Sequence, residues 1–273
     1  MEKPKISVII PVWKPDFNQL RKCLDSVINQ TYDKLEVLVM YRNSVGHDKE
    51  FFSIIDEYDD ERLKIISSKA TSFVSTLNEG ILNSSGELIA RIDADDYCDI
   101  QRFEKQVEFK EKNQLNIVGS WAHWISIEGE IIGKICLPVT HSEIRKKMMF
   151  HNPMLHPTLL MEKKMLIDVG LYDTTFIHAE DYELCFRLMS KGYKFGNVPL
   201  YLGYIRDAPD SRSRGLEWRK QRSYNMKVRS KAFHEFGFNN PQDIIYYMIT
   251  PISYFMTPGL WLKFKKFAGW TKL

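Results

Sequence analysis

Short apolar runs alternate with longer segments of helical periodicity through the first third of the chain. Residues 6–10 form a β-branched run that ends at Pro11, and Asp16 can cap a helix whose apolar side chains recur every three or four residues. The alternation continues with expected strands at 35–40, 63–66 and 88–92 and expected helices at 48–58 and 72–83. Helices between strands imply βαβ crossovers, so the pattern predicts an α/β fold with a parallel sheet covered on both faces.

The apolar strand at 88–92 stops abruptly at three carboxylates, those of Asp93, Asp95 and Asp96. Like charges this close raise one another's pKa values, so a folded chain keeps them together when a cation or hydrogen-bond donors compensate. Oxygen ligands favour a hard ion such as Mg²⁺ or Mn²⁺. The alternative is a solvated acidic turn that caps the following helix.

Parallel sheets of this kind bind ligands outside the carboxyl ends of their strands. Pro11, Val12 and Trp13 follow the first strand, and the acidic cluster follows the strand at 88–92. We therefore expect these two segments to meet in one crevice.

The second half of the chain is less regular. We expect a helix at 100–112, strands at 117–127 and 158–161, and a short helix at 163–169, whereas Pro153 and Pro157 exclude a helix at 151–158. Glu180 and Asp181 open a further helix. Acidic residues stabilise a first helical turn through the helix dipole, so capping and catalysis are both open for this pair.

Composition indicates a globular protein, because hydrophobic residues make up 44% of the 273 positions. The four cysteines lie far apart and show no Cys-x-x-Cys spacing, which argues against a disulfide framework and a zinc ribbon. With no signal-peptide pattern at the polar N-terminus, we expect a cytoplasmic protein.

The last 62 residues differ from the rest in charge. Residues 212–273 hold 12 Lys/Arg and 3 Asp/Glu, a net charge of +9, whereas residues 1–211 hold 26 and 32, a net charge of −6. A basic helix at 216–236 precedes a charge-free run at 244–262 that contains Pro251, Pro258 and Gly259. Two prolines make a poor membrane-spanning helix, so we expect an interfacial segment, with a helix docked on protein as the alternative. The same features fit nucleic acid poorly.

Several motifs occur in an order typical of one enzyme family. They are Ser7–Pro11, 24–31, Leu77-Asn-Glu-Gly80, 86–96, 102–106, His156-Pro-Thr158 and Ala179-Glu-Asp-Tyr182. Over residues 5–206 the chain resembles family 2 glycosyltransferases of the GT-A type, especially bacterial enzymes of capsule, exopolysaccharide and O-antigen synthesis. The resemblance implies a GT-A catalytic domain at 1–211, with a Rossmann-like, mostly parallel sheet flanked by helices, and a basic, aromatic helical tail at 212–273.

The resemblance also implies roles for matching residues. Asp93-Ala94-Asp95 resembles the family's DxD motif, in which Asp95 would bind Mn²⁺ or Mg²⁺ and Asp93 would contact the ribose or the metal shell. Asp181 matches the general base of an inverting single displacement, and Glu180 would orient the acceptor. The sugar nucleotide would contact Pro11, Val12, Trp13, Arg91 and Ala94, with Trp13 against the base.

The sequence departs from the family at two places. The acidic pair expected after the second strand is replaced by Tyr41 and Arg42, so a UDP-sugar is favoured but not secure, and either residue is expected to contact base or phosphate instead. No histidine follows Arg206, so either Asp207 substitutes or Arg206 and Arg212 hold the phosphates. His156 remains either a site residue or a structural one.

The sequence thus favours an inverting, metal-dependent glycosyltransferase. It would move a sugar from a nucleotide-diphosphate sugar to a hydroxyl of a lipid-linked saccharide, as a peripheral protein at the cytoplasmic membrane face. Two alternatives are a sugar nucleotidyltransferase and a catalytically decayed fold that acts as a binding partner. A separate base candidate at Asp181 and the lack of a glycine-rich phosphate loop argue against nucleotidyl transfer.

Overall fold

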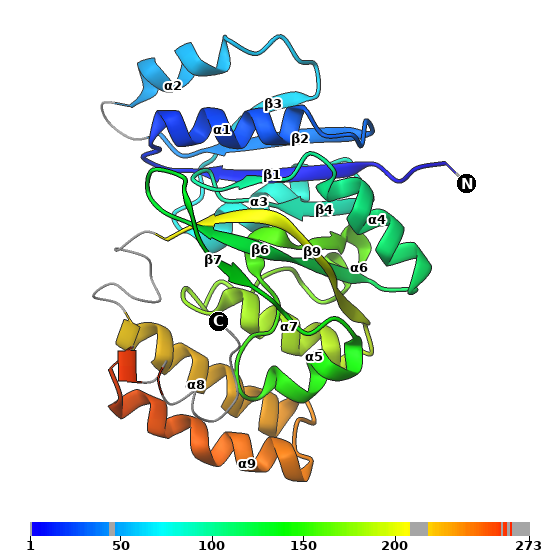
Figure 1. The fold of residues 1–273 in the computed structure, drawn as a ribbon, viewed down its shortest axis with the longest axis vertical. Coiled ribbons are helices and arrows are strands. Elements are labelled where there is room, and N and C mark those ends of the chain that lie inside the picture. The colour runs from blue at the N-terminus through cyan, green and yellow to red at the C-terminus, as the bar shows by residue number, and fades with distance from the viewer. Residues whose placement is uncertain (1, 44–46, 208–217, 258, 261–262, 264–273) are drawn as a thin grey trace.

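The computed structural model describes residues 2–43, 47–207, 218–257, 259–260 and 263. Nine strands in this part of the chain form one sheet, in the order β3-β2-β1-β4-β8-β6-β9-β5, with β7 paired to β6 (Figure 1). The strands are β1 (Ile6–Val12), β2 (Leu35–Tyr41), β3 (Leu63–Ser67), β4 (Leu88–Arg91), β5 (Tyr97–Cys98), β6 (Ile117–Ile125), β7 (Ile131–Ile135), β8 (Leu160–Glu162) and β9 (Phe195–Arg206).

The sheet is parallel where its strands alternate with helices in sequence. Strands β1 to β4 are mutually parallel, β8 runs antiparallel to β4 and β6, and β9 pairs parallel to β6. Strands β5 and β7 run antiparallel to β9 and β6. The predicted α/β architecture is therefore confirmed, and the parallel part places the carboxyl ends of β1, β2 and β4 at one edge.

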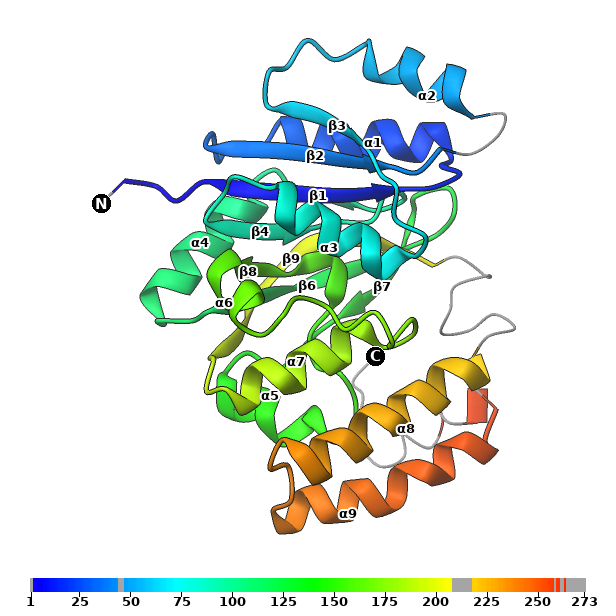
Figure 2. The ribbon, with the colours of Figure 1, turned by 180° about the vertical axis from the view of Figure 1, so that it is seen from behind.

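Helices cover both faces of the sheet (Figures 1 and 2). The described helices are α1 (Phe17–Ile28), α2 (Asp48–Ile55), α3 (Phe73–Asn83), α4 (Arg102–Lys112), α5 (His141–Met148), α6 (Lys163–Asp168), α7 (Glu180–Ser190), α8 (Trp218–Glu235) and α9 (Pro241–Ile249), with 3₁₀ turns η1 (His156–Thr158) and η2 (Thr250–Phe255). One core joins the sheet to α1, α2 and α4, and a second joins it to α3, α6 and α7. Burying each large aliphatic side chain contributes about 1.5–3 kcal/mol, so these two cores fix the sheet edge on which the site is built.

Local sequence explains where the first helices begin. The carboxylate of Asp16 accepts hydrogen bonds from the backbone N–H groups of Asn18 and Gln19, each at 3.0 Å. Ser72 caps α3 through a reciprocal exchange with Ser75. Both caps satisfy N–H groups that a helix leaves unpaired, which confirms the expected helix starts.

The C-terminal helices pack on the rest of the fold. Val228 and Ala232 of α8 belong to the core that contains α7, and Arg229 donates to the carbonyl oxygens of Met149 at 2.9 Å and Phe150 at 2.7 Å. Asp243 of α9 is buried and pairs with Arg145 of α5 at 2.7 Å. The described part of the tail is thus docked on protein on this side, while the expected domain boundary near 212–216 lies outside the described residues.

Candidate active site

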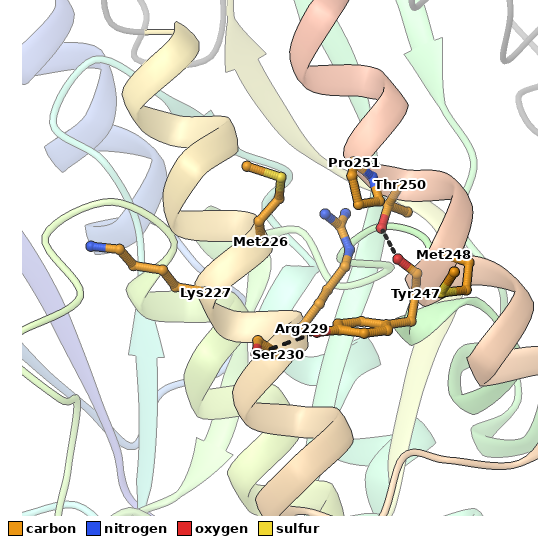
Figure 3. A pocket seen from close by; sticks show the side chains of 8 residues that line it. All are labelled: Met226, Lys227, Arg229, Ser230, Tyr247, Met248, Thr250 and Pro251. Atoms are coloured by element: carbon orange, nitrogen blue, oxygen red, sulfur yellow. Dashed lines mark hydrogen bonds between the residues drawn. The ribbon is translucent and has the colours of Figure 1, made fainter.

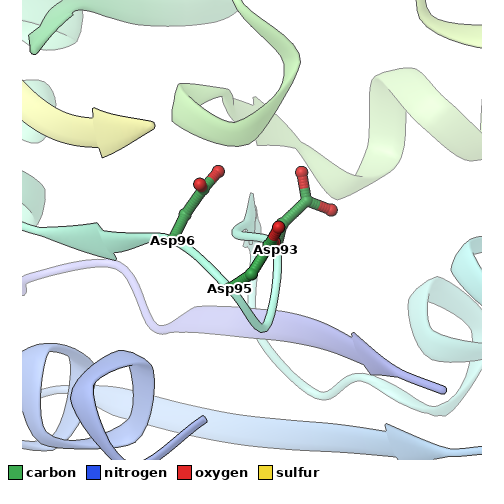
Figure 4. Close-up of side chains that lie close together, drawn as sticks. All are labelled: Asp93, Asp95 and Asp96. Atoms are coloured by element: carbon green, nitrogen blue, oxygen red, sulfur yellow. The ribbon is translucent and has the colours of Figure 1, made fainter. Parts of the chain in front are cut away.

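The acidic cluster occupies the turn that follows β4. Asp93, Asp95 and Asp96 each place one carboxylate oxygen within 4.8 Å of the others, and all three side chains come from one turn (Figure 4). Because β4 pairs in parallel with β1, this turn lies beside the segment that follows β1. The two segments therefore lie at one sheet edge, whereas the expected crevice between them stays a prediction.

A buried arginine partly compensates the first carboxylate. The guanidinium of Arg91 pairs with Asp93, and its side chain is 4% exposed. Burial alone would lower the pKa of Arg91, but the negative charges of Asp93, Asp96 and Glu180 outweigh it and leave the pKa raised. The charges of both the acidic turn and the first residue of α7 thus act on the pKa of Arg91.

Strand β9 supports the other side of the turn. The backbone N–H of Arg206 donates to Oδ1 of Asp96 at 2.8 Å, and its Nε donates to the carbonyl oxygen of Asp95 at 2.9 Å. Its Nη1 donates to the carbonyl oxygens of Ser126 and Ile127. Arg206 therefore holds the backbone of the turn in place, and these three N–H donors are already used by the protein.

Two of the three carboxylates in the turn have raised pKa values. Burial, followed by the charge of Asp93, raises the pKa of Asp95. Burial and the charges of Asp93 and Asp95 raise the pKa of Asp96 well above its ordinary value. Three oxygen donors in this state fit a hard divalent cation, which would offset their repulsion. Asp93 and Asp95 are the residues that would hold it.

An aromatic and cationic group lies after β1 and β2. Trp13 is 56% exposed, with the guanidinium carbon of Arg42 at 5.4 Å and the ammonium of Lys14 at 4.9 Å from its ring. Tyr41 lies in the core instead: its ring is fully buried and stacks on Phe51 at a centroid distance of 3.8 Å. Of the expected pair, only Arg42 reaches the surface beside Trp13.

Helix α7 presents the expected catalytic pair. Ala179 precedes the helix in a left-handed conformation with a φ of 74°. Asp181 is half-buried and its Oδ2 accepts a hydrogen bond from the side-chain amide of Asn152 at 2.8 Å, whereas Glu180 is 5% exposed. An oriented carboxylate at a helix start can accept a proton from a substrate hydroxyl.

Comparison with known proteins identifies the family. A model of glycosyl transferase family 2 matches residues 7–170, more than half of the chain. The chain belongs to glycosyl transferase family 2. It is 31% identical over 188 residues to the O-antigen biosynthesis glycosyltransferase WbnJ of Escherichia coli, covering 68% of this chain and 72% of that protein. It is 27% identical over 271 residues to the amylovoran biosynthesis glycosyltransferase AmsE of Erwinia amylovora, covering 92% and 94%.

The fold agrees with this assignment. The mannosyltransferase PcManGT from Pyrobaculum calidifontis, solved in complex with GDP-Man and Mn²⁺, superposes with a TM-score of 0.68 at 16% identity. The match covers all of this chain and 77% of that one. The predicted GT-A fold and glycosyltransferase activity are confirmed, which leaves the nucleotidyltransferase alternative without support.

The sequence left the roles of two further residues of this glycosyltransferase undecided, those of His156 and Arg212. His156 is buried, and its Nε2 lies 2.9 Å from the hydroxyl of Tyr172, in a short 3₁₀ turn. Tyr172 is itself fixed by two hydrogen bonds between its backbone and the side-chain amide of Asn78. His156 is thus part of a buried network, and Arg212 lies outside the described residues.

Sequence reasoning missed the residues that position the site. Asn152 lies in the irregular 151–158 segment, and its contact with Asp181 follows no sequence periodicity. The support that Arg206 gives to Asp95 depends on the pairing of β9 with β5 and β6, which the sequence did not reveal. Such partners become visible only when distant strands are brought together.

Proposed function

We propose that this glycosyltransferase moves one sugar from a nucleotide-diphosphate sugar to a hydroxyl of a lipid-linked saccharide, with inversion at the anomeric carbon and dependence on a divalent ion. One observation carries the proposal. The buried guanidinium of Arg91 pairs with Asp93 of the acidic turn, and the charge of Glu180, the neighbour of Asp181, contributes to the raised pKa of Arg91. A donor held at the turn would therefore have the base candidate nearby.

The donor would lie across the carboxyl ends of β1, β2 and β4. Trp13 offers an exposed face for the base, the backbone of Pro11 and Val12 would line the nucleotide, and Arg42 would contact base or phosphate. Arg91 Nε is buried without a hydrogen-bond partner among the described residues, so it can donate to a diphosphate oxygen beside Ala94. A UDP-sugar remains the favoured donor.

Asp181 would act as the general base. It accepts the proton of the acceptor hydroxyl as that oxygen attacks the anomeric carbon, and the bond from this carbon to the diphosphate oxygen breaks with its electron pair on the diphosphate. Asn152 keeps the Asp181 carboxylate oriented, and Glu180 helps to position the acceptor. Mn²⁺ or Mg²⁺ on Asp93 and Asp95 would supply positive charge for the departing diphosphate.

The acceptor would be met at the cytoplasmic face of the membrane, with the protein attached peripherally. Among the described residues, no helix has the length and apolar character needed to cross a bilayer. Helix α9 and η2 nevertheless expose five large apolar side chains, those of Ile244, Ile245, Met248, Ile252 and Phe255. An exposed apolar ridge behind a basic helix suits the headgroup region of an anionic membrane.

Replacing the base tests the chemistry. We expect Asp181→Asn to lower kcat by about 10²–10⁴-fold with little change in the affinity for donor, because the amide cannot accept the proton. Asp173→Asn, at a nearby carboxylate that pairs with Lys231, is the matched control. Release of nucleoside diphosphate is measured across a panel of nucleotide sugars with Mn²⁺ or Mg²⁺.

The other functions predict different results. Release of pyrophosphate instead of nucleoside diphosphate would support nucleotidyl transfer. Full turnover of Asp181→Asn would remove Asp181 from the mechanism. Absence of turnover with every donor, in a wild-type protein that still binds its partners, would support the decayed fold.

A further inference from the structure

A cavity of about 450 Å³ lies between the two C-terminal helices. Met226 and Arg229 of α8 face Tyr247 of α9 and Thr250 and Pro251 of η2 across it (Figure 3). The remaining lining residues are Lys227, Ser230 and Met248. Its size is typical of small-molecule sites, and its thioether, aromatic and proline side chains suit an apolar ligand.

The cavity is continuous with the exposed apolar ridge of the tail. Met248 lines the cavity and is also 69% exposed, and Ile252 and Phe255 follow it at 52% and 86% exposure. A hydrocarbon chain could therefore pass from a membrane surface into the cavity without crossing a polar rim.

Helix α8, which forms one wall of this apolar site, is basic. Helix α8 carries six Lys/Arg residues and only Glu235 as an acid. Lys227 extends to the side of α8 away from α9 (Figure 3) and forms no ion pair within the part of the chain that the structure describes. Its ammonium lies 4.9 Å from the ring of Tyr224. Lys227 thus offers positive charge to an anionic group on the side of α8 away from α9.

The same side of α8 contacts the segment that precedes the proposed base. The ring of Tyr224 lies 5.3 Å from that of His178 and 6.3 Å from that of Phe176, in the segment that precedes α7. His178 stands only three residues before Asp181. An anion at Lys227 would therefore lie on the side of α8 that faces the catalytic pair.

We infer that the cavity between α8 and α9 binds the hydrocarbon chain of the lipid that carries the acceptor, with Lys227 beside the lipid phosphate. The inference rests on the proposed function, from which it takes the lipid-linked acceptor. It adds a defined binding site: the chain enters between the C-terminal helices, the phosphate lies at Lys227, and the sugar that receives the new unit extends past Tyr224 toward Asp181.

Binding of short polyprenyl phosphates to the full chain tests the inference directly. Farnesyl phosphate, geranyl phosphate, farnesol and inorganic phosphate are titrated separately by calorimetry, without donor. We expect farnesyl phosphate to bind at least about tenfold more tightly than geranyl phosphate, because more apolar carbon is buried. Inorganic phosphate alone should give no measurable binding, and binding as tight as that of farnesyl phosphate would indicate a simple anion site instead.

Substitutions then locate the binding. Met226→Trp should fill the cavity and weaken farnesyl phosphate at least about tenfold. Ile167→Trp, which fills the separate cavity beside α6, is the matched control and should change the affinity by less than about twofold. Lys227→Met should weaken farnesyl phosphate about fivefold and leave farnesol unchanged.

These results test the lipid-binding site independently of the proposed function. Unchanged affinity in Met226→Trp, with folding verified by thermal unfolding, would overturn the cavity site, and Ser230→Leu provides a second filling variant if Met226→Trp does not fold. Equal loss of farnesol and farnesyl phosphate in Lys227→Met would overturn the phosphate position. Lipid binding without any donor turnover would contradict the proposed function alone.

Discussion

The Nε atom of Arg206 donates a hydrogen bond to the carbonyl oxygen of Asp95 over 2.9 Å, joining the end of β9 to the middle of the acidic turn. Lysine cannot reproduce the several fixed donors of a guanidinium. We therefore expect Arg206→Lys to lower the apparent affinity for Mn²⁺ by about 10–100-fold, as is common when residues supporting metal ligands are changed. Donor hydrolysis measured against Mn²⁺ concentration checks this.

A matched arginine provides the control for that experiment. Arg21 is only partly buried and pairs with Glu57 at 2.6 Å on the protein surface, so Arg21→Lys should leave the Mn²⁺ dependence unchanged. If Arg206→Lys retained wild-type Mn²⁺ affinity, the turn would hold its shape without the guanidinium of Arg206.

Trp13 is an exposed ring in the segment that follows β1, where the base is expected. Removing it in Trp13→Ala should raise the KM for the donor about tenfold, because a stacked base contributes about 1–3 kcal/mol. Trp13→Phe, which keeps a ring, should recover most of the loss. Leu82 is 61% exposed on α3, and Leu82→Ala is the control. Equal donor KM values in wild type and Trp13→Ala would place the base elsewhere.

Glu36 gives the stability of the protein a defined pH dependence. Burial alone would raise the pKa of Glu36, but hydrogen bonds from Ser7, Ser85 and Lys64 outweigh it and lower the pKa to about 2. A lowered pKa means that the contribution is complete above about pH 4.5, the ordinary value, and is lost as the pH falls toward 2. This contribution amounts to about 2–3 kcal/mol.

The comparison with Glu36→Gln isolates this effect. At pH 7 we expect the variant to have a lower free energy of unfolding than the wild type, and the difference should shrink between pH 4.5 and pH 2. Urea denaturation at several pH values measures it. A difference that stays constant over this range would show that the charge of Glu36 does not stabilise the fold.

The exposed apolar ridge of α9 and η2 should determine membrane association. We expect the double variant Met248→Ser and Ile252→Ser to weaken binding to anionic phospholipid vesicles by about tenfold, since apolar side chains drive interfacial binding. Higher salt should weaken wild-type binding further by screening the basic helix. Leu82→Ser is the control in a sedimentation assay, and equal sedimentation of all three proteins would contradict the role of the ridge.

The sequence predicted the elements whose determinants are local. The strand at β1, the Asp16 cap and the apolar positions of α1 all lie within one short segment, and the structure reproduces them. Strand β9 was not predicted, because Gly196, Pro199 and Gly203 interrupt its apolar pattern. Strands β5 and β7 and helix α5 were missed as well, and the Thr140 and Glu143 capping box of α5 was a usable signal.

The same distinction between local and long-range determinants applies to the site residues. Asp93 and Asp95 could be found because they are near neighbours at the end of one strand. Tyr41 was expected to contact the donor, but β2 extends through it and its ring packs on Phe51 inside the fold. Neither that packing nor the amide of Asn152 on Asp181 could be read from spacing, because each depends on chain segments meeting in three dimensions.

The change from parallel to antiparallel pairing beside β4 coincides with a single division of the amino-acid sequence. All strands on the β1 side of β4 come from residues 6–67, and all strands beyond it come from residue 97 onward. A chimaera joined just after the acidic turn would keep one complete parallel half and receive a foreign second half. Under the proposed function, we expect such recombinants to keep their donor and to attach its sugar to a different glycan.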